Sequence, residues 1–489
     1  MTRRTPQSRL VLLGISVMLV LTACSIQPPS IELIGGGVDG SNNGDAGIAV
    51  DPETGRTIDL PVTLDPQAPT ADVPAGPAAA SCLGQATDTG VGADEIKLGS
   101  TIAASGPTSN ISGPIVKGML SYFNQVNAQG GVHGRKIKLV WYDDGWDAQR
   151  GKGLIKKLVE QDKVFVLSVV PSSNGLDASK AYLEEKRMPV FGTSGLIESQ
   201  FRSPMQWPVG TSTKSAARIG LVDMKQRGAT NAALIWLDLL AGAEARDAFR
   251  DGVVRVLGKN RPEDFITSEQ RVNIAEADFG PVWTRIQSDT RRWQSERNLP
   301  VDGIPDFVSF FIDPTNAIKA LQAAEKLNFR PKKGWGGGAP LFLDLVPQGS
   351  AYAGKTGLLA GTSFFPPLPE VAAKNPAVNL YIQTVRKFYG DDVDLNNPYL
   401  EGGYAGAALT VEILKRVGPC LTREGAIKAA DSITNYSAAG LTQPLTYRPI
   451  GVGAGHYGNL HGQTVKATPD GWVIDGTSKK DPTPGVTTE

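Results

Sequence analysis

The sequence has few of the residues that most often carry chemistry. Its 489 residues include only three cysteines and three histidines, His133, His456 and His461. His133 lies in a glycine-rich turn, and the spacing of the other two is too loose to predict a metal site. The Gly-x-Ser-x-Gly pattern of nucleophile-elbow hydrolases is absent. These absences disfavour an enzyme, and the sequence predicts neither a metal nor a cofactor.

The chain also lacks a net charge and, beyond residue 24, any long hydrophobic run. Lys plus Arg and Asp plus Glu each count 49, so the formal charge is zero and nucleic acid is not an expected partner. No apolar run of 18 or more residues follows residue 24, so no membrane span is predicted beyond it. The chain is nevertheless 41% apolar. A body of about 400 residues with this composition predicts two or three domains with sizeable cores.

The first 23 residues predict a secretory signal. Three arginines precede an apolar core over residues 10–21, which is shorter than the ~20 residues that a membrane span needs. Residues 21–24, LTAC, resemble the lipobox of bacterial lipoproteins, in which the cysteine is lipidated and the signal is cut off before it. This resemblance implies lipidation of Cys24 and anchoring at the extracytoplasmic face of the cell membrane. The alternative is a plain signal peptide with an unmodified cysteine.

Residues 24–92 predict a flexible tether. The stretches GGGVDGSNNGDAG and LDPQAPTADVPAGPAAAS contain few aromatic residues and no hydrophobic periodicity. Such composition cannot bury enough apolar surface to fold. A mixed Gly/Pro segment of this length holds a folded body away from a membrane.

Two cysteines, Cys82 and Cys420, remain when Cys24 is set aside. Outside the cytoplasm such a pair becomes oxidised. We therefore expect a disulfide that closes a very long loop, worth about 4 to 5 kcal/mol by chain entropy. Two separate buried thiols are the alternative.

Short β-rich runs alternate with helical patterns in two series. The first series has strands at 95–103, 135–144, 163–170 and 188–194, and the second has strands at 232–238 and 305–313. Alternating βα units predict a parallel sheet with helices on both faces. Two series therefore predict an α/β protein with two doubly wound lobes of similar build.

Ligands of doubly wound sheets bind beyond the carboxyl ends of the strands. The expected loops there, AASGPTSN, VPSSNG and GTSGL, are rich in Ser, Thr, Asn and Gly. They offer uncharged donors and acceptors, although helix capping is the alternative role for Ser172, Ser173 and Asn174. The cluster Asp143, Asp144 and Asp147 predicts turn and capping roles in preference to a cation site. Three hydroxyl-rich loops in one lobe favour a binding rim.

Residues 96–151 resemble the opening of the type I periplasmic binding proteins, the branched-chain amino-acid and amide receptors of ABC importers. The matching motifs are Ser-Gly-Pro, the helix end Asn-Ala-Gln-Gly-Gly, Gly-Arg-Lys-Ile and the pair Asp143-Asp144. Further pieces at 241–253, 277–287 and 314–331 extend the likeness over roughly residues 93–475.

This resemblance implies two lobes joined by a hinge of crossing segments, with a cleft that closes on the ligand. The first lobe would comprise residues 93–212 and 340–440. The second would comprise residues 213–339, together with 441–489 as a C-terminal tail.

The same resemblance implies a ligand site. Ser172, Ser173, Ser194 and Gly195 match the loops that hold the ligand carboxylate in amino-acid-binding members. At three further positions the chain departs from the family: Ile111 and Ala241 replace aromatic residues, and Gly337 stands where the carboxylate meets the ligand ammonium. Ser105, Asn174 and Asp313 complete the expected set, with Trp335 and Asp238 near the same strand ends.

A buried ammonium without a counter-charge is costly, so a free α-amino acid is not the expected ligand. A carboxylate with an apolar body, an aromatic acid, an amide or a short peptide fits better. The expected partners are this solute, an ABC permease with its ATPase, and the membrane through the lipid anchor. A ligand-sensing receptor with the same cleft is the alternative function, and an exported enzyme is less favoured.

Overall fold

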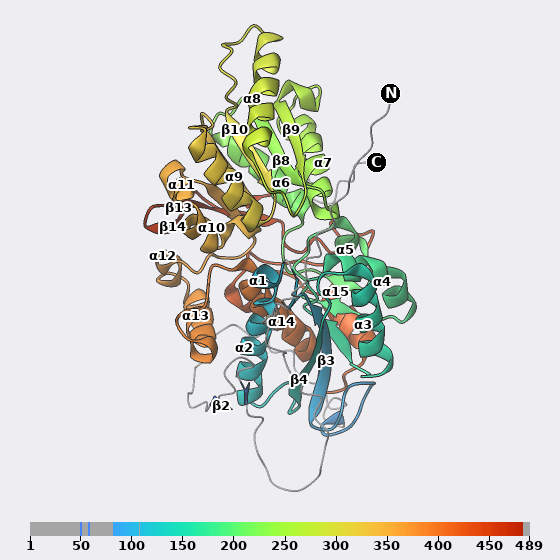
Figure 1. Cartoon of the computed structure of the whole chain (residues 1–489). Helices are drawn as coiled ribbons and strands as arrows, with labels where there is room; N and C mark the ends of the chain where they lie inside the picture. Colours follow the sequence, from blue (N-terminus) through green and yellow to red (C-terminus); the bar gives the residue numbers. More distant parts are fainter. Residues whose placement is uncertain (1–48, 51–56, 59–81, 107, 483–489) are drawn as a thin grey trace, which may run out of the picture. The chain divides into compact units, whose positions relative to one another are not determined.

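The computed structural model describes residues 49–50, 57–58, 82–106 and 108–482 (Figure 1). The chain divides into two compact units, residues 1–57 and 58–489, and nearly all described residues belong to the second. The strands β1 (Ala49–Val50) and β2 (Thr57–Ile58) contain two residues each. The expected signal, Cys24 and most of the tether lie outside the described residues. None of the helices that the structure describes has the length and apolar character to cross a membrane.

The first sheet has five parallel strands in the order β4-β3-β5-β6-β7. Its middle strand β5 is buried throughout, as its continuous apolar run requires. The strands are β3 (Glu95–Ile102), β4 (Lys136–Asp143), β5 (Val166–Ser168), β6 (Val190–Phe191) and β7 (Gln206–Trp207).

Helices cover both faces of this first sheet, as the alternating pattern predicts. On one face, Leu98 and Ile102 share a core with α2 (Ile115–Ala128) and α14 (Pro398–Val417). On the other face, Leu167 packs with α3 (Ala148–Glu160) and α4 (Ser173–Glu185). Two separate hydrophobic clusters therefore sandwich the sheet.

The second sheet follows the order β14-β13-β12-β11-β10-β8-β9, with β15 paired to β13. Its strands from β8 to β12 are parallel, whereas β13 and β14 are antiparallel. Helices α6 and α7 cover one face, and α8 and α9 cover the other. The strands are β8 (Ala232–Leu237), β9 (Ile266–Val272), β10 (Phe307–Phe311), β11 (Gly334–Gly337), β12 (Leu359–Thr362), β13 (His461–Thr468), β14 (Gly471–Ile474) and β15 (Lys479–Lys480).

The remaining helices complete the two lobes. Those of the second sheet are α6 (Thr213–Gln226), α7 (Leu240–Arg255), η2 (Pro262–Asp264), α8 (Gly280–Ser295), α9 (Pro314–Lys326), η3 (Ala339–Phe342), α10 (Leu345–Gly349) and α11 (Ala351–Thr356). The others are α1 (Ser109–Ser112), α5 (Glu198–Arg202), α12 (Pro369–Ala372), α13 (Pro376–Tyr389), α15 (Arg423–Asp431) and η4 (Ala438–Gly440).

The structure moves two expected lobe boundaries. β12 pairs with β11, so residues 340–362 join the second sheet and not the first lobe. Leu441, Leu445 and Tyr447 pack in the core of the first sheet, so the chain does not return to the second lobe at residue 441. Strand pairing decides both boundaries, and the residue pattern alone does not show which neighbour a strand will take.

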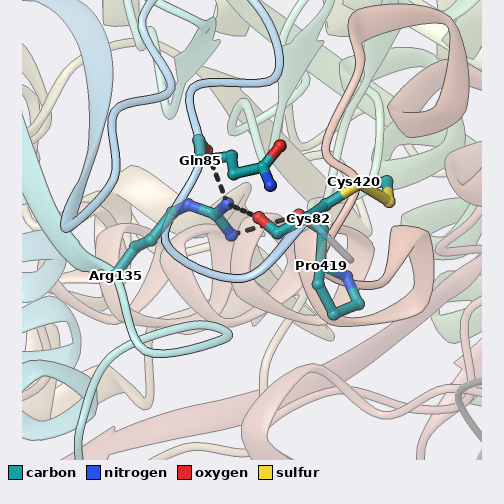
Figure 2. Close-up of a disulfide and its surroundings, with 5 residues drawn as sticks. All are labelled: Cys82, Gln85, Arg135, Pro419 and Cys420. Carbon is teal, nitrogen blue, oxygen red and sulfur yellow. Dashed lines mark hydrogen bonds between the residues drawn. A yellow bond between two sulfur atoms is a disulfide. The ribbon is translucent and has the colours of Figure 1, made fainter. Parts of the chain in front are cut away.

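The expected disulfide joins Cys82 to Cys420, with their Cα atoms 5.1 Å apart. Beside it, the buried Arg135 donates hydrogen bonds to the carbonyl oxygens of Cys82 (2.7 Å), Gln85 (2.9 Å) and Pro419 (3.1 Å) (Figure 2). Burial lowers the pKa of Arg135. The guanidinium and the disulfide together attach the start of the body to the segment between α14 and α15.

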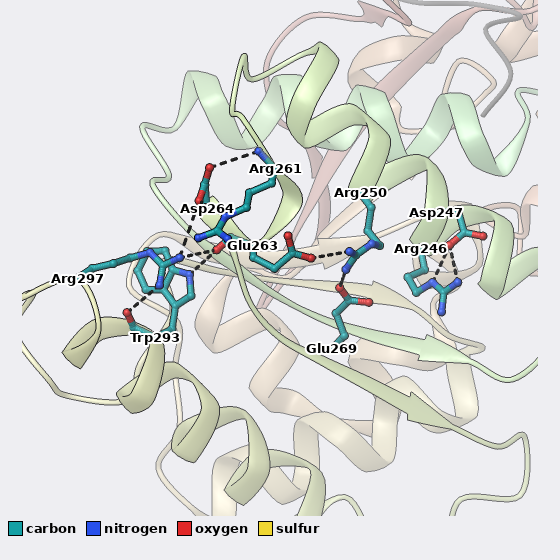
Figure 3. Close-up of polar contacts among 9 residues, drawn as sticks. All are labelled: Arg246, Asp247, Arg250, Arg261, Glu263, Asp264, Glu269, Trp293 and Arg297. Carbon is teal, nitrogen blue, oxygen red and sulfur yellow. Dashed lines mark hydrogen bonds and ion pairs between the residues drawn. The ribbon is translucent and has the colours of Figure 1, made fainter. Parts of the chain in front are cut away.

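Ion pairs connect the outer elements of the second lobe (Figure 3). Arg250 of α7 pairs with Glu263 of η2 at 2.6 Å and with Glu269 of β9. The indole of Trp293 donates to the carbonyl oxygen of Glu263 at 2.8 Å. These contacts join α7, η2, β9 and the end of α8 on the edge of the sheet.

Candidate functional site

Three segments carry the chain between the two sheets, at residues 208–213, 362–365 and 459–462. Thr211 links them, since its backbone N–H donates to Ser363 Oγ (3.1 Å) and its hydroxyl donates to the His461 carbonyl (2.8 Å). The buried Asn459 amide donates to the carbonyl oxygens of Val209 (3.2 Å) and Ser363 (3.0 Å). These bonds make the three crossings one hinge, as the family resemblance implied.

Each sheet has one point where its strand order reverses. β3 lies between β4 and β5 in the first sheet, and β8 lies between β9 and β10 in the second. The loops that leave the carboxyl ends of such strands separate and open a crevice, which is where doubly wound sheets bind ligands. The crevices are therefore bordered by the loops after β3 and β5 and by those after β8 and β10.

Serines and an asparagine border the crevice of the first sheet. Ser105 is exposed after β3, and its backbone N–H donates to Asp143 Oδ1 at 3.2 Å. Ser172 caps α4 by accepting a bond from the Gly175 N–H at 3.4 Å, and the buried Ser173 is the first residue of that helix. Asn174 Nδ2 donates to the Trp146 carbonyl at 3.3 Å. The capping alternative is thus confirmed for Ser172.

The loop after β6 carries two unsatisfied hydroxyl groups. Thr193 Oγ1 and Ser194 Oγ are buried and have no hydrogen-bond partner within the described part of the chain. Thr193 was not among the expected residues, although the same Gly-Thr-Ser-Gly loop contains it. Gly195 has a left-handed φ of 72°, and a Cβ there would lie 2.5 Å from the Phe201 ring. Gly195 therefore serves the turn, while its neighbours supply the donors.

The aspartate cluster has turn and capping roles, as predicted. Asp147 caps α3 by accepting from the Arg150 N–H at 2.7 Å. Partial burial would raise the pKa of Asp143, but hydrogen bonds from Ser105, Gly145 and Ala104 outweigh it and lower that pKa. Burial raises the pKa of Asp144 and outweighs the hydrogen bond that its carboxylate accepts from the Trp146 N–H at 2.9 Å.

The crevice of the second sheet is bordered by apolar side chains. Leu239 and Leu240 follow β8 and are 42% and 48% exposed, and Ile274 is similarly exposed after the neighbouring strand β9. Ala241 is half-buried in the first turn of α7. Asp238 is paired with Arg271. Sequence reasoning missed the two leucines, although consecutive leucines directly after a buried strand are a usable signal.

Two expected residues of the second sheet have structural constraints. Both carboxylate oxygens of Asp313 are used at the start of α9, where they accept from the Asn316 N–H (3.1 Å) and from Asn316 Nδ2 (2.8 Å). A Cβ on Gly337 would lie 2.1 Å from the Phe310 carbonyl oxygen, so the backbone leaves no room for a side chain. Trp335 lies in the core and donates to Thr356 Oγ1 at 3.0 Å.

Two further expected residues lie partly or wholly outside the part of the chain that the structure describes. Ile111 belongs to α1, and its side chain is outside the described part of the structure, as is Cys24. A hollow with a cavity volume of about 10 Å³ lies at the hinge and is lined by Thr362, Ser363, Phe364, Gln443, His461 and Ser478, among others. That volume is below the ~300 Å³ at which ligand pockets begin.

The carboxyl edges of the two sheets face each other. Asn396 Nδ2, before α14, donates to Asp344 Oδ1, before α10, at 2.8 Å. The Glu198 N–H at the start of α5 donates to Glu244 Oε2 of α7 at 2.9 Å. Both bonds join residues of opposite lobes, so the two crevices open toward a common space.

One sequence pattern has no functional counterpart. Residues 349–356, GSAYAGKT, have the spacing of a phosphate-binding loop, in which a loop follows a strand and precedes a helix. Here the segment is largely helical, from the end of α10 through α11. Lys355 pairs with Glu325 at 2.9 Å, and a Cβ on Gly354 would lie 2.7 Å from the Thr468 carbonyl. The glycine serves helix packing against β13.

A family model described as periplasmic binding protein matches residues 95–455. The leucine-specific-binding protein of Salmonella typhimurium is 25% identical over 224 residues, which are 42% of this chain and 60% of that protein. The chain thus matches less than two thirds of this relative's length.

Two solved structures have the same fold. The fatty acid ABC transporter substrate-binding protein from Thermomonospora curvata superposes with a TM-score of 0.64 at 18% identity, over 81% of this chain and 95% of that one. A solute-binding protein of an ABC transporter from R. palustris, in complex with benzoate, gives 0.62 at 16% identity, over 81% and 100% of the two chains.

Proposed function

Because this chain belongs to the periplasmic binding protein family, we propose that it is the extracytoplasmic solute-binding component of an ABC importer. It binds a small solute between its lobes, closes by a hinge motion and releases the solute unchanged to a membrane permease that works with an ATPase. The family match over residues 95–455 supports this role. The anchor in this proposal is a lipid on Cys24.

The observation that carries the proposal is the arrangement of the two sheets. Two doubly wound sheets present their strand-order reversals to one another, and three hydrogen-bonded crossings connect them. Rotation about a few crossing residues closes two such lobes on a ligand. Closure places the hydroxyl-bearing loops of one lobe opposite the leucines of the other.

The chemistry of the two rims favours an acid with an apolar body as the ligand. Thr193 and Ser194 offer unsatisfied hydroxyl groups for a carboxylate, and Leu239 and Leu240 offer exposed apolar surface. A relative solved with benzoate supports the same class of ligand.

A free α-amino acid would need a carboxylate for its ammonium. Gly337 has no room for one, and the oxygens of Asp313 cap α9. Asp238 is paired with Arg271, and Glu244 accepts the Glu198 N–H. An uncompensated buried ammonium is costly, so we expect leucine to bind poorly despite the likeness to a leucine-binding protein.

A thermal-shift panel tests the proposal. Purified protein is heated with leucine, valine, benzoate, 4-hydroxybenzoate, octanoate and benzamide, and hits are measured by calorimetry. A solute at about 100 times its Kd adds about 2.7 kcal/mol of stability. We expect at least one apolar acid to raise Tm and to be recovered unchanged. Micromolar binding of leucine would contradict the ligand class, and turnover of a solute would contradict the receptor role.

A further inference from the structure

One contact between the lobes is built from acids. Asp344 precedes α10, which packs on α9 of the second lobe, whereas Asp394 and Asn396 precede α14, which packs on α2 of the first. Asn396 Nδ2 donates to Asp344 Oδ1 at 2.8 Å, and the Asn396 backbone N–H donates to Asp394 Oδ1 at 3.0 Å. One asparagine therefore holds a carboxylate from each lobe. We call these three residues the acid contact.

The acid contact is electrostatically unfavourable when both carboxylates are ionised. Burial and then the neighbouring Asp344 raise the pKa of Asp394 to about 6, against opposing backbone N–H bonds from Asn396, Asp344 and Asn397. Tyr381 of α13 faces the same space, and burial followed by the charges of Glu401 and Asp394 raises its pKa. Asp344, Tyr381 and Glu401 all have acidic side chains, so none of these side chains compensates the charge of Asp394.

We propose that the acid contact is a proton-dependent closure device, in which protonation of Asp394 holds the lobes together and its ionisation favours their separation. The proposal concerns regulation of the same cleft, and it rests on the proposed function only where closure is equated with solute binding. A neutral Asp394 removes the repulsion with the carboxylate of Asp344.

The direction of the pH effect follows from linkage. With the lobes in contact, the pKa of Asp394 is about 6. Separation removes Asp344 from its neighbourhood, so that pKa falls toward the ordinary value of about 3.9. Closure therefore takes up protons. Closure is favoured as the pH falls through about 6. The shift of the equilibrium toward the closed form is complete only below the pKa that Asp394 has when the lobes are separated. Each pKa unit between the two states is a tenfold change in the closure equilibrium.

The second interlobe contact acts in the same direction. Burial raises the pKa of Glu244, while the Glu198 N–H bond and the charge of Lys214 lower it and the charges of Glu198 and Asp177 raise it. Lys214 also pairs with Glu198 at 3.4 Å. The pH dependence of the Glu244 contact is the same in every variant of Asp394, so the difference between two variants does not contain it.

Small-angle X-ray scattering of the ligand-free protein tests the proposal. We compare the wild type, Asp394→Asn and the control Asp392→Asn at about pH 5 and about pH 7.5, at equal ionic strength. The amide introduced by Asp394→Asn mimics the neutral acid, whereas Asp392 is an exposed carboxylate two residues away. We expect the wild type and the control to be more compact at the lower pH. The Asp394→Asn variant should show a smaller change in compactness between the two pH values than either, and should be more compact than the wild type at about pH 7.5.

An unchanged wild-type scattering profile between the two pH values would overturn the proposal. So would a full wild-type pH response in Asp394→Asn. Should that variant fail to fold, Asp344→Asn removes the partner charge and carries the same expectation. No solute enters this measurement, so its failure leaves the receptor role standing, and failure of the solute panel leaves the acid contact standing.

Discussion

At the scale of single residues, the two leucines after β8 distinguish the second-lobe rim from the polar rim opposite. Leu239 and Leu240 expose much of their surface at the start of α7, directly after the carboxyl end of β8. Exposed apolar residues that border a cleft gain free energy when a ligand covers them, about 1.5 to 3 kcal/mol for a fully buried leucine. They are therefore candidates for selecting the apolar body of the solute.

The double substitution Leu239→Ser, Leu240→Ser should weaken binding of the best acid from the panel by about tenfold or more, because apolar burial is lost. Thermal stability should change little, since both side chains are already exposed. Calorimetry gives Kd. Leu327→Ser is the matched control, with 48% exposure at the far end of α9. Equal losses of affinity in both variants would remove the leucines from the site.

Glu401 is a buried acid in the core of the first lobe. It is 1% exposed in the first turn of α14, and its Oε1 has no hydrogen-bond partner in the part of the chain that the structure describes. Burial raises its pKa well above the ordinary value. Stability associated with the neutral form is therefore complete below about pH 4, the unfolded pKa, and is lost as the pH rises through the folded pKa.

The side chain introduced by Glu401→Gln does not titrate. The free energy of unfolding of this variant should therefore exceed that of the wild type by an amount that grows from about pH 4 to about pH 8. The gain should grow by up to about 1.4 kcal/mol for each pH unit between the unfolded and the folded pKa, because the buried acid must stay protonated while the unfolded chain ionises. Urea unfolding at both pH values measures it. Glu412→Gln provides the control on the same helix, where the carboxylate pairs with Arg416 at 2.7 Å. If the free energies of unfolding of Glu401→Gln and the wild type differed by the same amount at both pH values, burial would not raise the pKa of Glu401.

At the scale of elements, α14 approaches α2 with its backbone. A Cβ on Gly403 would lie 2.2 Å from the Ile115 carbonyl oxygen, and a Cβ on Gly118 would lie 2.0 Å from that of Leu400. Backbone atoms cannot move aside as a flexible side chain can. Gly403 of α14 and Gly118 of α2 therefore set the distance between the two helices that cover one face of the first sheet.

Gly403→Ala should destabilise the protein by about 2 kcal/mol or more through overpacking. The adjacent Gly402→Ala should be neutral or stabilising by up to about 1 kcal/mol, since its Cβ would make an ordinary 3.5 Å contact with Phe364 and alanine is the better helix former. Urea unfolding of the two variants provides the test. Similar destabilisation by both would show that the helices do not meet at Gly403.

Helix caps show why the sequence cannot assign a single role to some expected site residues. Ser172 and Asp313 are correct as residues at the carboxyl edges of the sheets, but each caps a helix. Hydroxyl and carboxylate side chains serve capping and ligand binding equally well, so composition cannot separate the two roles. The leucines after β8 were missed because attention went to polar residues, although two consecutive leucines directly after a buried strand are a usable signal.

At the scale of the whole molecule, the lipid anchor remains a prediction, because Cys24 lies outside the described residues. Cys24→Ser should release the protein from membranes, since an acyl chain contributes about 0.8 kcal/mol per buried CH₂ and the body has no predicted membrane span of its own. Detergent phase partition of whole-cell extracts measures the shift from the detergent to the aqueous phase. A wild type already in the aqueous phase would contradict lipidation.

By itself, the sequence determined the α/β class, the two βα series, the pairing of Cys82 with Cys420 and the loops at the carboxyl edges. These follow from local periodicity, from residue type and from the small number of cysteines. Only the tertiary structure decided that β12 joins β11, that Gly337 has no room for a side chain, and that Asp344 meets Asn396 across the lobes. Each of these depends on atoms from segments distant in the chain, and no local pattern encodes which segments will meet.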